Sequence, residues 1–458
     1  MMTLGELATL IPGARLLGDA DLGFTQVSTD TRSLPPRCLF FALKGERFDA
    51  HDFADQAVTG GALALVVDRP LALDTPQLVV PDTRLALGLA AAGWRARQLL
   101  PLIAVTGSNG KTTVTQMLAK ILATAAGEDG RLATRGNLNN DIGLPLTLFR
   151  LLPEHRYAVV ELGMNHPGEI AYLARLAQPT VALVNNAQRE HQEFMGTVEA
   201  TAHENGASIS ALPADGIAVF PADDPCAPIW RELAGTRRIL DFGFRQAAAV
   251  QASFTTVAGG IALELQTPAG PLNLRLKLAG AHNAHNAAAA ATAALAAGLA
   301  PEVIGRGLEA FTPVAGRGVI RRTAHGATLI DDTYNANPDS VRAAIDLLAS
   351  QSGPGILVLG DMGEVGAQGP EFHAEIGHYA RERGVEGLLA LGELTRAAVS
   401  AYNDHDGQSG RHFDDIEALI GQARAGAVAG TTVLVKGSRF MKMERVVQAL
   451  AVDETQSG

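Results

Sequence analysis

The chain has 458 residues, an apolar fraction of 47%, a charged fraction of 19% and a formal net charge of −11 at pH 7. At about 150 residues per domain this length predicts about three domains, and the composition is that of a folded globular protein. The negative charge, without any basic cluster, argues against non-specific binding of nucleic acid.

The ends of the chain and its cysteines predict a cytoplasmic protein. Met1–Leu10 has no basic segment, so we expect no signal peptide. Cys38 and Cys226 are too few for a disulfide framework and predict reduced thiols. The alanine-rich run Ala287–Ala300 is short for a membrane span, so we expect a buried helix and no association with a membrane.

Residues 1–98 predict a small α/β domain without a phosphate loop, whose expected strands are Leu39–Leu43, Ala62–Val67 and Gln77–Val80. Residues 99–312 predict a central domain in which a mainly parallel sheet alternates with helices. Its expected strands are Leu102–Thr106, Tyr157–Glu161, Val181–Asn185 and Gly216–Phe220. A more β-rich insertion, residues 250–278, precedes the alanine-rich helix.

The apolar run Leu102–Thr106 predicts a strand that leads into a phosphate loop and a helix over Val114–Ala125. The loop and its flanks are Gly107, Ser108, Asn109, Gly110, Lys111, Thr112 and Thr113. Its glycines let backbone N–H groups approach phosphate, Lys111 would reach the terminal phosphates of ATP, and the Thr112 hydroxyl would bind Mg²⁺. Val105 stands where the usual pattern has its first glycine, and the alternative is an ordinary glycine-rich turn.

Glu161 and His191 follow neighbouring predicted strands. A carboxylate at a strand end beside a phosphate loop is suited to complete a nucleotide-bound Mg²⁺ site, whereas the alternative for Glu161 is a solvated residue. His191 is either a ligand at the same sheet edge or a surface histidine.

Two segments dense in amides, residues 135–145 and 331–338, suit recognition of sugar, peptide or phosphate, or are polar loops with Asx turns. Arg317, between the second and third regions, could reach a phosphate from a hinge.

Residues 313–458 predict a second doubly wound α/β domain, in which Asp332, Asp361 and Lys436 lie at strand ends. The expected strands are Thr328–Asp332, Gly355–Gly360, Gly387–Leu391 and Thr432–Val435. The expected helices are centred on Ser340–Leu348, Glu371–Arg383, Leu394–Ala401 and Ile416–Ala425.

Together these motifs resemble the Mur ligases, the ATP-dependent amino-acid and peptide ligases of peptidoglycan synthesis, over essentially the whole chain. The motifs that carry the resemblance are residues 107–113, Gly136–Pro145, Gly163–Asn165, Asp332–Asn337 and Val433–Arg439. They are most similar to those of family members that add D-Ala-D-Ala to UDP-N-acetylmuramoyl-tripeptide. The resemblance implies a UDP-binding N-terminal domain, a central ATPase domain with a phosphate loop, and a Rossmann-like C-terminal domain.

The resemblance also implies a mechanism. The γ-phosphoryl group of ATP moves to the terminal carboxylate of the UDP-sugar peptide, and the dipeptide amine attacks the resulting acyl phosphate to give amide and phosphate. Lys111 would neutralise charge, Thr112 and Glu161 would hold one Mg²⁺, and His191 would hold a second.

By the same resemblance, the remaining site residues divide by ligand, and a monomer is expected. Ser28, Thr29, Arg32 and Lys44 would bind the UDP end, and Asn137, Asn139 and Asn140 would bind substrate. Asn283 or Asn286 would meet the adenine, and Arg317 and Asp332 would contact ATP. Asn335, Asn337, Lys436 and Arg439 would help to hold D-Ala-D-Ala.

One residue departs from the family pattern. Many members carry a lysine, carbamylated by CO₂, that helps to bind the second Mg²⁺, and Asn205 stands at the aligned position here. An amide cannot be carbamylated, so the Asn205 oxygen, Glu204 or water replaces the carbamate, or the second metal site is altered.

Other readings remain open at this point. A different Mur-type or folylpolyglutamate-type ligase would use the same chemistry, although the N-terminal UDP loop disfavours the latter. A P-loop switch or transport ATPase is a different class, and no Asn-Lys-x-Asp guanine motif occurs in the chain. A non-catalytic nucleotide-binding regulator would be expected to lack Lys111 or Glu161, and both are present.

Overall fold

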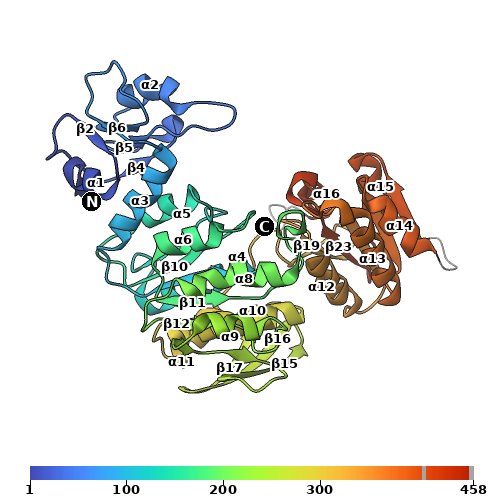
Figure 1. Cartoon of the computed structure of the whole chain (residues 1–458). Coiled ribbons are helices and arrows are strands. Elements are labelled where there is room, and N and C mark those ends of the chain that lie inside the picture. The colour runs from blue at the N-terminus through green and yellow to red at the C-terminus, as the bar shows by residue number, and fades with distance from the viewer. Residues whose placement is uncertain (405–408, 453–458) are drawn as a thin grey trace.

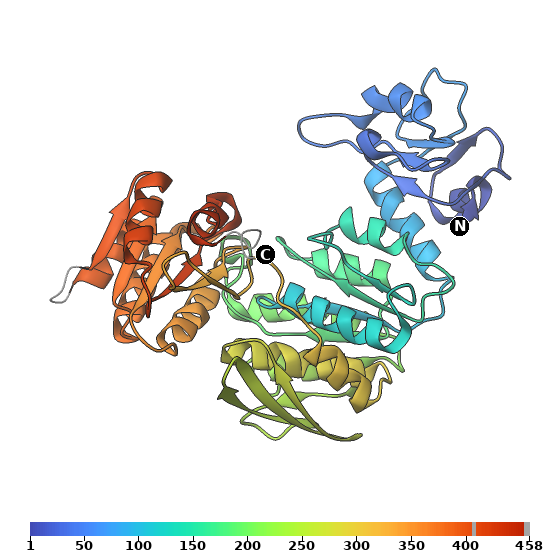
Figure 2. The same ribbon diagram turned by 180° about the vertical axis from the view of Figure 1, so that it is seen from behind.

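The computed structural model describes residues 1–404 and 409–452, which form three α/β domains. The N-terminal and C-terminal domains each border the central domain and stand apart from one another (Figure 1). The opposite view shows the same arrangement, with the alanine-rich helix on the lower side of the central domain (Figure 2). The three-domain fold expected from the sequence is confirmed.

The N-terminal domain is built on a five-stranded sheet in the order β2-β7-β6-β5-β4, in which only the edge strand β2 is antiparallel to its neighbour. The three expected strands are all present. The strands are β2 Arg15–Leu17, β4 Val27–Ser28, β5 Leu39–Phe41, β6 Ala64–Val67 and β7 Gln77–Val79, and the helices are α1 Leu4–Leu10 and α2 Ala54–Thr59. A short ribbon joins β1 Met2–Thr3 and β3 Gly23–Phe24.

The central domain has a six-stranded parallel sheet in the order β13-β12-β11-β8-β10-β9. Its strands are β8 Leu102–Thr106, β9 Arg131–Ala133, β10 Tyr157–Glu161, β11 Val181–Val184, β12 Ile217–Val219 and β13 Arg238–Ile239. Because β8 lies between β10 and β11, the loops that follow these three strands meet at one edge of the sheet. That edge carries the phosphate loop, Glu161 and the segment before His191.

Helices cover both faces of this sheet. On one side α4 Lys111–Ala126, α10 Ala281–Ala296 and α11 Pro301–Glu309 pack together and carry a four-stranded sheet. That sheet comprises β14 Phe242–Gly243, β15 Val250–Val257, β16 Gly260–Thr267 and β17 Gly270–Leu276, which confirms the β-rich insertion. The other helices are α3 Thr83–Arg95, α5 Gly143–Leu148, α6 Glu169–Ala177, α7 Gln192–Met195, α8 Val198–Ser210 and α9 Ala227–Ala234.

The alanine-rich run lies largely in α10, and the expected buried helix is confirmed. Ala287–Ala291 are all fully buried, and their small side chains let α10 lie close against α4. Among the described residues, no helix is long and apolar enough to cross a membrane.

The C-terminal domain has a six-stranded sheet in the order β18-β19-β23-β20-β21-β22, parallel except at β18. Its strands are β18 Val319–Arg322, β19 Thr328–Asp332, β20 Gly355–Gly360, β21 Gly387–Leu391, β22 Gly410–Phe413 and β23 Thr432–Lys436. Its helices are α12 Pro338–Ala349, α13 Gly369–Glu382, α14 Thr395–Asn403, α15 Ile416–Gly426 and α16 Glu444–Leu450. The sequence did not predict the edge strands β18 and β22, which are short and half-exposed.

Arg95 fastens the connection between the first two domains. It ends α3, which packs against α5 and α6, and it is only 5% exposed. Its guanidinium donates to the carbonyls of Ala177 and Gln178 at 3.0 and 3.1 Å, and also to those of Gln98 and Leu100. One side chain therefore satisfies four carbonyls, at the end of α6 and in the linker before β8.

We expect Arg95→Met to destabilise the protein by about 2–4 kcal/mol, because it leaves several buried carbonyls without donors. Thermal and urea unfolding would measure the loss. Arg97→Met is the matched control, since the Arg97–Glu6 ion pair at 3.3 Å is half-exposed and such surface pairs contribute little to stability. Equal shifts for the two variants would contradict the assigned role of Arg95.

Candidate active site

Two positions of the phosphate loop have a positive φ and little room for a side chain, so both favour glycine. Gly107 has φ +127°, and a Cβ there would lie 3.0 Å from the backbone nitrogens of Asn185 and Asn186. Gly110 has φ +81°, and a Cβ there would lie 2.3 Å from Oδ1 of Asn286. The two glycines direct the N-terminus of α4 into the cavity described below.

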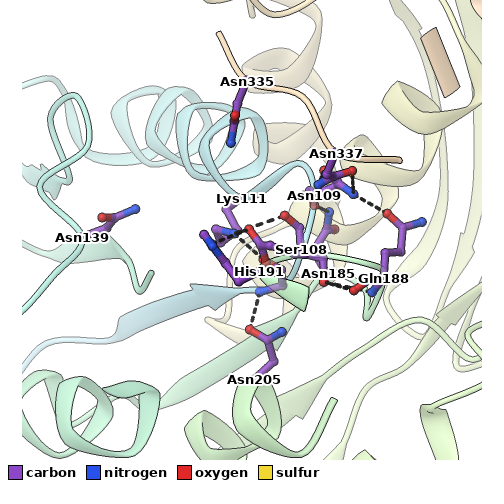
Figure 3. A network of polar contacts seen from close by, with 12 residues as sticks. Ser108, Asn109, Lys111, Asn139, Asn185, Gln188, His191, Asn205, Asn335 and Asn337 are labelled. Carbon is purple, nitrogen blue, oxygen red and sulfur yellow. Dashed lines mark hydrogen bonds and ion pairs between the residues drawn. The ribbon is translucent and has the colours of Figure 1, made fainter. Parts of the chain in front are cut away.

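Amide side chains hold the loop in this shape (Figure 3). The Gly107 N–H donates to Oδ1 of Asn205 at 3.0 Å, and the Asn109 N–H donates to Oδ1 of Asn186 at 2.8 Å. Nδ2 of Asn185 donates to the Asn109 carbonyl at 2.7 Å. Asn185 and Asn186 lie directly after β11, so the neighbouring strand supports the loop.

Lys111 is folded back onto its own loop. Its Nζ donates to the carbonyls of Gly107 and Ser108 at 2.6 and 3.2 Å, and to Oε1 of Glu190 at 2.7 Å. Burial raises the pKa of the Glu190 carboxyl above its usual value, against the opposing charges of Lys111 and His191. No sequence motif singles out Glu190, and its contact with Lys111 is seen only in the fold.

Glu161 ends β10 and is 2% exposed. Its Oε1 accepts from Nδ2 of Asn139 at 2.7 Å, whereas Oε2 has no hydrogen-bond partner. A buried carboxylate oxygen left unsatisfied at a cavity wall is suited to a cation. Asn139 thus orients Glu161 with one side-chain atom.

His191 is held by the C-terminal domain. Its Nδ1 lies 2.7 Å from Oε2 of Glu364, and its Nε2 lies 3.6 Å from Oε1 of Glu190. The close approach of His191 lowers the pKa of the Glu364 carboxyl. Both residues of this pair have left-handed backbones, with φ +48° for His191 and +59° for Glu364, a conformation uncommon for residues other than glycine.

Three further groups of the expected site come from beyond the central sheet. Arg317 stacks on the Tyr334 ring at 4.0 Å and donates to Oγ1 of Thr112 at 2.9 Å. Lys436, 3% exposed at the end of β23, pairs with Oδ2 of Asp332 at 2.6 Å. Asn337 Nδ2 donates to Oδ1 of Asn109 at 2.9 Å, so an amide pair joins the two domains.

A cavity of 840 Å³ lies between the central and C-terminal domains. Most of the predicted site residues line it, namely Ser108, Asn109, Gly110, Lys111, Thr112, Thr113, Asn137, Asn139, Asn140, Glu161, His191, Asn283, Asn286, Arg317, Asp332, Asn335, Asn337 and Lys436. Its depth also includes His285, which stacks on Phe244 with ring centroids 4.1 Å apart. Groups that the sequence placed on different loops therefore share one space.

Other predicted residues lie outside this lining. Gly107 belongs to the phosphate loop but does not line the cavity. Ser28 is buried, and Arg32 is exposed in an ion pair with Asp30 at 2.7 Å. Thr29 and Lys44 also belong to the N-terminal domain, and Arg439 is an exposed partner of Glu444 at 3.2 Å.

The first Mg²⁺ site expected from the sequence combines one carboxylate, Glu161, with the hydroxyl of Thr112. Within residues 1–404 and 409–452, no group of three His, Cys, Asp or Glu side chains is arranged to hold a metal ion. Thr112 contributes a hydroxyl, and Glu161 contributes an oxygen without a hydrogen-bond partner. Such a pair fits Mg²⁺, which usually keeps waters and shares phosphate oxygens instead of filling a cage of protein ligands.

Two replacements considered for the missing lysine are engaged elsewhere. Oδ1 of Asn205 accepts from Gly107, so this side chain supports the phosphate loop. The Glu204 oxygens accept from the N–H groups of Gly168 and Ile170 at 2.9 and 2.8 Å, which caps the start of α6. Neither side chain is free to take the place of a carbamate.

Family models match each part of the chain. Residues 23–95 match the Mur ligase family catalytic domain, residues 105–294 the Mur ligase middle domain, and residues 316–439 the Mur ligase glutamate ligase domain.

Named relatives match the chain from end to end. The UDP-N-acetylmuramoyl-tripeptide–D-alanyl-D-alanine ligase of Escherichia coli K12 is 43% identical over 461 residues, which cover 99% of each protein. The corresponding protein of Haemophilus influenzae is 39% identical and covers 97% of each.

Solved structures agree with these matches. A crystal structure of MurF from Acinetobacter baumannii has a TM-score of 0.90 and 36% identity, covering 98% of each chain. MurF from Thermotoga maritima in complex with ADP has a TM-score of 0.82 and 26% identity, covering 93% of this chain and 96% of that one. Models, relatives and structures agree over all three domains, and the chain belongs to the Mur ligase family.

Proposed function

We propose that this ATP-dependent ligase adds D-Ala-D-Ala to UDP-N-acetylmuramoyl-tripeptide, as the names of its relatives state for them. The observation that carries the proposal is the single cavity in which the phosphate loop of the central domain faces Asp332, Asn337 and Lys436 of the C-terminal domain. An enzyme that activates a carboxylate with ATP and then presents an amine to it needs both sets of groups in one space. We further propose that it acts as a cytoplasmic monomer.

In this proposal each domain binds a different substrate. Residues 1–98 bind the UDP end through Ser28, Thr29, Arg32 and Lys44, residues 99–312 bind ATP, and residues 313–458 present the dipeptide. Asn335, Asn337, Lys436 and Arg439 serve the dipeptide, while Asn137, Asn139 and Asn140 serve the tripeptide end. The adenine lies near Asn283, Asn286 and the His285–Phe244 stack, and Arg317 and Asp332 contact ATP.

The proposed chemistry begins with two anions that must approach each other, the tripeptide carboxylate and the γ-phosphate of ATP. Lys111 and the α4 N-terminus offset their charge, and the free oxygen of Glu161 with the Thr112 hydroxyl would hold Mg²⁺ on the phosphates. Bound Mg²⁺ supplies further charge neutralisation. The phosphoryl group moves to the carboxylate and ADP leaves, after which the dipeptide amine attacks and phosphate departs.

The acyl phosphate must be kept from water, and contacts between the central and C-terminal domains would help to shield it. Arg317 contacts Thr112 at the start of α4, and Asn337 pairs with Asn109. These contacts position the C-terminal domain over the phosphate loop.

The test is phosphate release with ATP, Mg²⁺, UDP-N-acetylmuramoyl-tripeptide and D-Ala-D-Ala, omitting each in turn, with the product identified by mass. We expect release only in the full mixture, together with a UDP-pentapeptide. Release from ATP alone, indifferent to both partners, would reject the ligase assignment.

We expect Lys111→Met to lower kcat by about 10²–10³-fold in this assay, because the transferred phosphoryl group loses its counter-charge. Lys120→Met is the matched control, since Lys120 lies farther along α4 and outside the cavity lining. A Lys111→Met enzyme as active as the control would remove the phosphate loop from the mechanism.

Activity should be the same in degassed buffer and in buffer with added bicarbonate. Asn205 cannot form a carbamate, and Lys111 and Lys436, the lysines of the cavity lining, are ion-paired at 2.7 and 2.6 Å. Initial rates measured with and without bicarbonate would decide, and stimulation by bicarbonate would contradict this expectation.

A further inference from the structure

Glu190 is a buried carboxylate that the mechanism above leaves without a task. It is 9% exposed, and its Oε1 is shared between Lys111 at 2.7 Å and His191 at 3.6 Å. Its Oε2 is buried without a hydrogen-bond partner. Buried carboxylate oxygens are normally satisfied, so this one indicates that a partner is missing.

Lys111, which donates to Oε1 of Glu190, is expected to contact the phosphates of ATP when nucleotide binds. Lys111 now uses its ammonium on two carbonyls of its own loop and on Glu190. To contact a phosphate it must give up at least part of this set. Glu190 would then face incoming phosphate without a counter-charge, which is strongly unfavourable in a buried site.

His191 is oriented so that its Nε2 could bind a cation that replaces the Lys111 ammonium beside Glu190. Glu364 engages Nδ1 of the ring, and Nε2 faces Glu190. A carboxylate fixing one imidazole nitrogen while the other serves a metal is a common arrangement around metal ligands. The two distances, 2.7 Å from Nδ1 to Glu364 and 3.6 Å from Nε2 to Glu190, place the His191 ring between the two carboxylates.

We propose that Glu190 binds a second divalent cation together with Nε2 of His191, and that the Lys111 ammonium occupies its place until nucleotide arrives. The proposal rests on the proposed ATP-dependent function. Glu190 would supply the anionic ligand that Asn205 and Glu204 do not, because those two side chains accept hydrogen bonds from backbone N–H groups. Two protein ligands form no complete cage, so the cation enters with the nucleotide, whose phosphate and waters complete its coordination.

The experiment counts Mn²⁺ bound to the full chain by electron paramagnetic resonance, with a non-hydrolysable ATP analogue present. We expect two Mn²⁺ for the unaltered chain. Glu190→Gln should weaken one of them by about tenfold or more, and Glu161→Gln should weaken the other. Glu193→Gln is the matched control, since Glu193 is exposed and outside the cavity lining, and it should bind two as before.

Several results would overturn the assignment. If Glu190→Gln binds both ions with unchanged affinity, Glu190 only balances the charge of Lys111. A single Mn²⁺ on the unaltered chain would also reject the second site. Glu190→Asp, which keeps the charge, serves if Glu190→Gln does not fold, and weakened binding of the same ion is again expected. Because the count needs no acceptor, its failure is distinct from a failure of the ligase reaction.

Discussion

The contact between the phosphate loop and the end of β11 is the constraint on which the cavity depends. Gly107 has φ +127° and lies so close to the backbone of Asn185 and Asn186 that a Cβ would be crowded, and hydrogen bonds with the side chains of the same asparagines fix Asn109. A parallel sheet makes this possible, since β8 and β11 are neighbours and their loops leave the same edge. Displacing this contact would move Lys111, Glu190 and the α4 N-terminus together.

The segment after Asn186 extends this support to the C-terminal domain. Arg189 forms ion pairs with Asp339 on α12 at 2.7 Å and with Glu375 on α13 at 2.6 Å. The next two residues, Glu190 and His191, contact Lys111 and Glu364. A few consecutive residues thus contact the phosphate loop and the neighbouring domain, so the geometry of the phosphate site and the position of that domain are mechanically linked.

Local sequence patterns predicted the strands, loop and helix that carry the site residues. They did not predict contacts between residues far apart in the sequence. The strand, loop and helix around Lys111 follow from an apolar run, glycines and helical spacing, and Glu161, Asp332 and Lys436 were found because they end strands. Glu190 resembles any loop acid in sequence, and only the fold shows that it is buried against Lys111. Asn205 was aligned with a metal-binding position, yet it supports Gly107, because its helix passes beneath the loop.

The pairing of Lys111 with Glu190 has a consequence for which anions the loop accepts. A phosphate loop with an unpaired lysine attracts any phosphate or sulfate, whereas here an incoming anion must compete with a carboxylate that stays in the site. An anion that arrives with a bound cation needs counter-charge for itself and leaves none missing at Glu190, since Lys111 would contact the phosphate and the cation would contact Glu190. The buried ion pair therefore disfavours an anion that arrives without a cation, because Glu190 would then be left buried without a counter-charge.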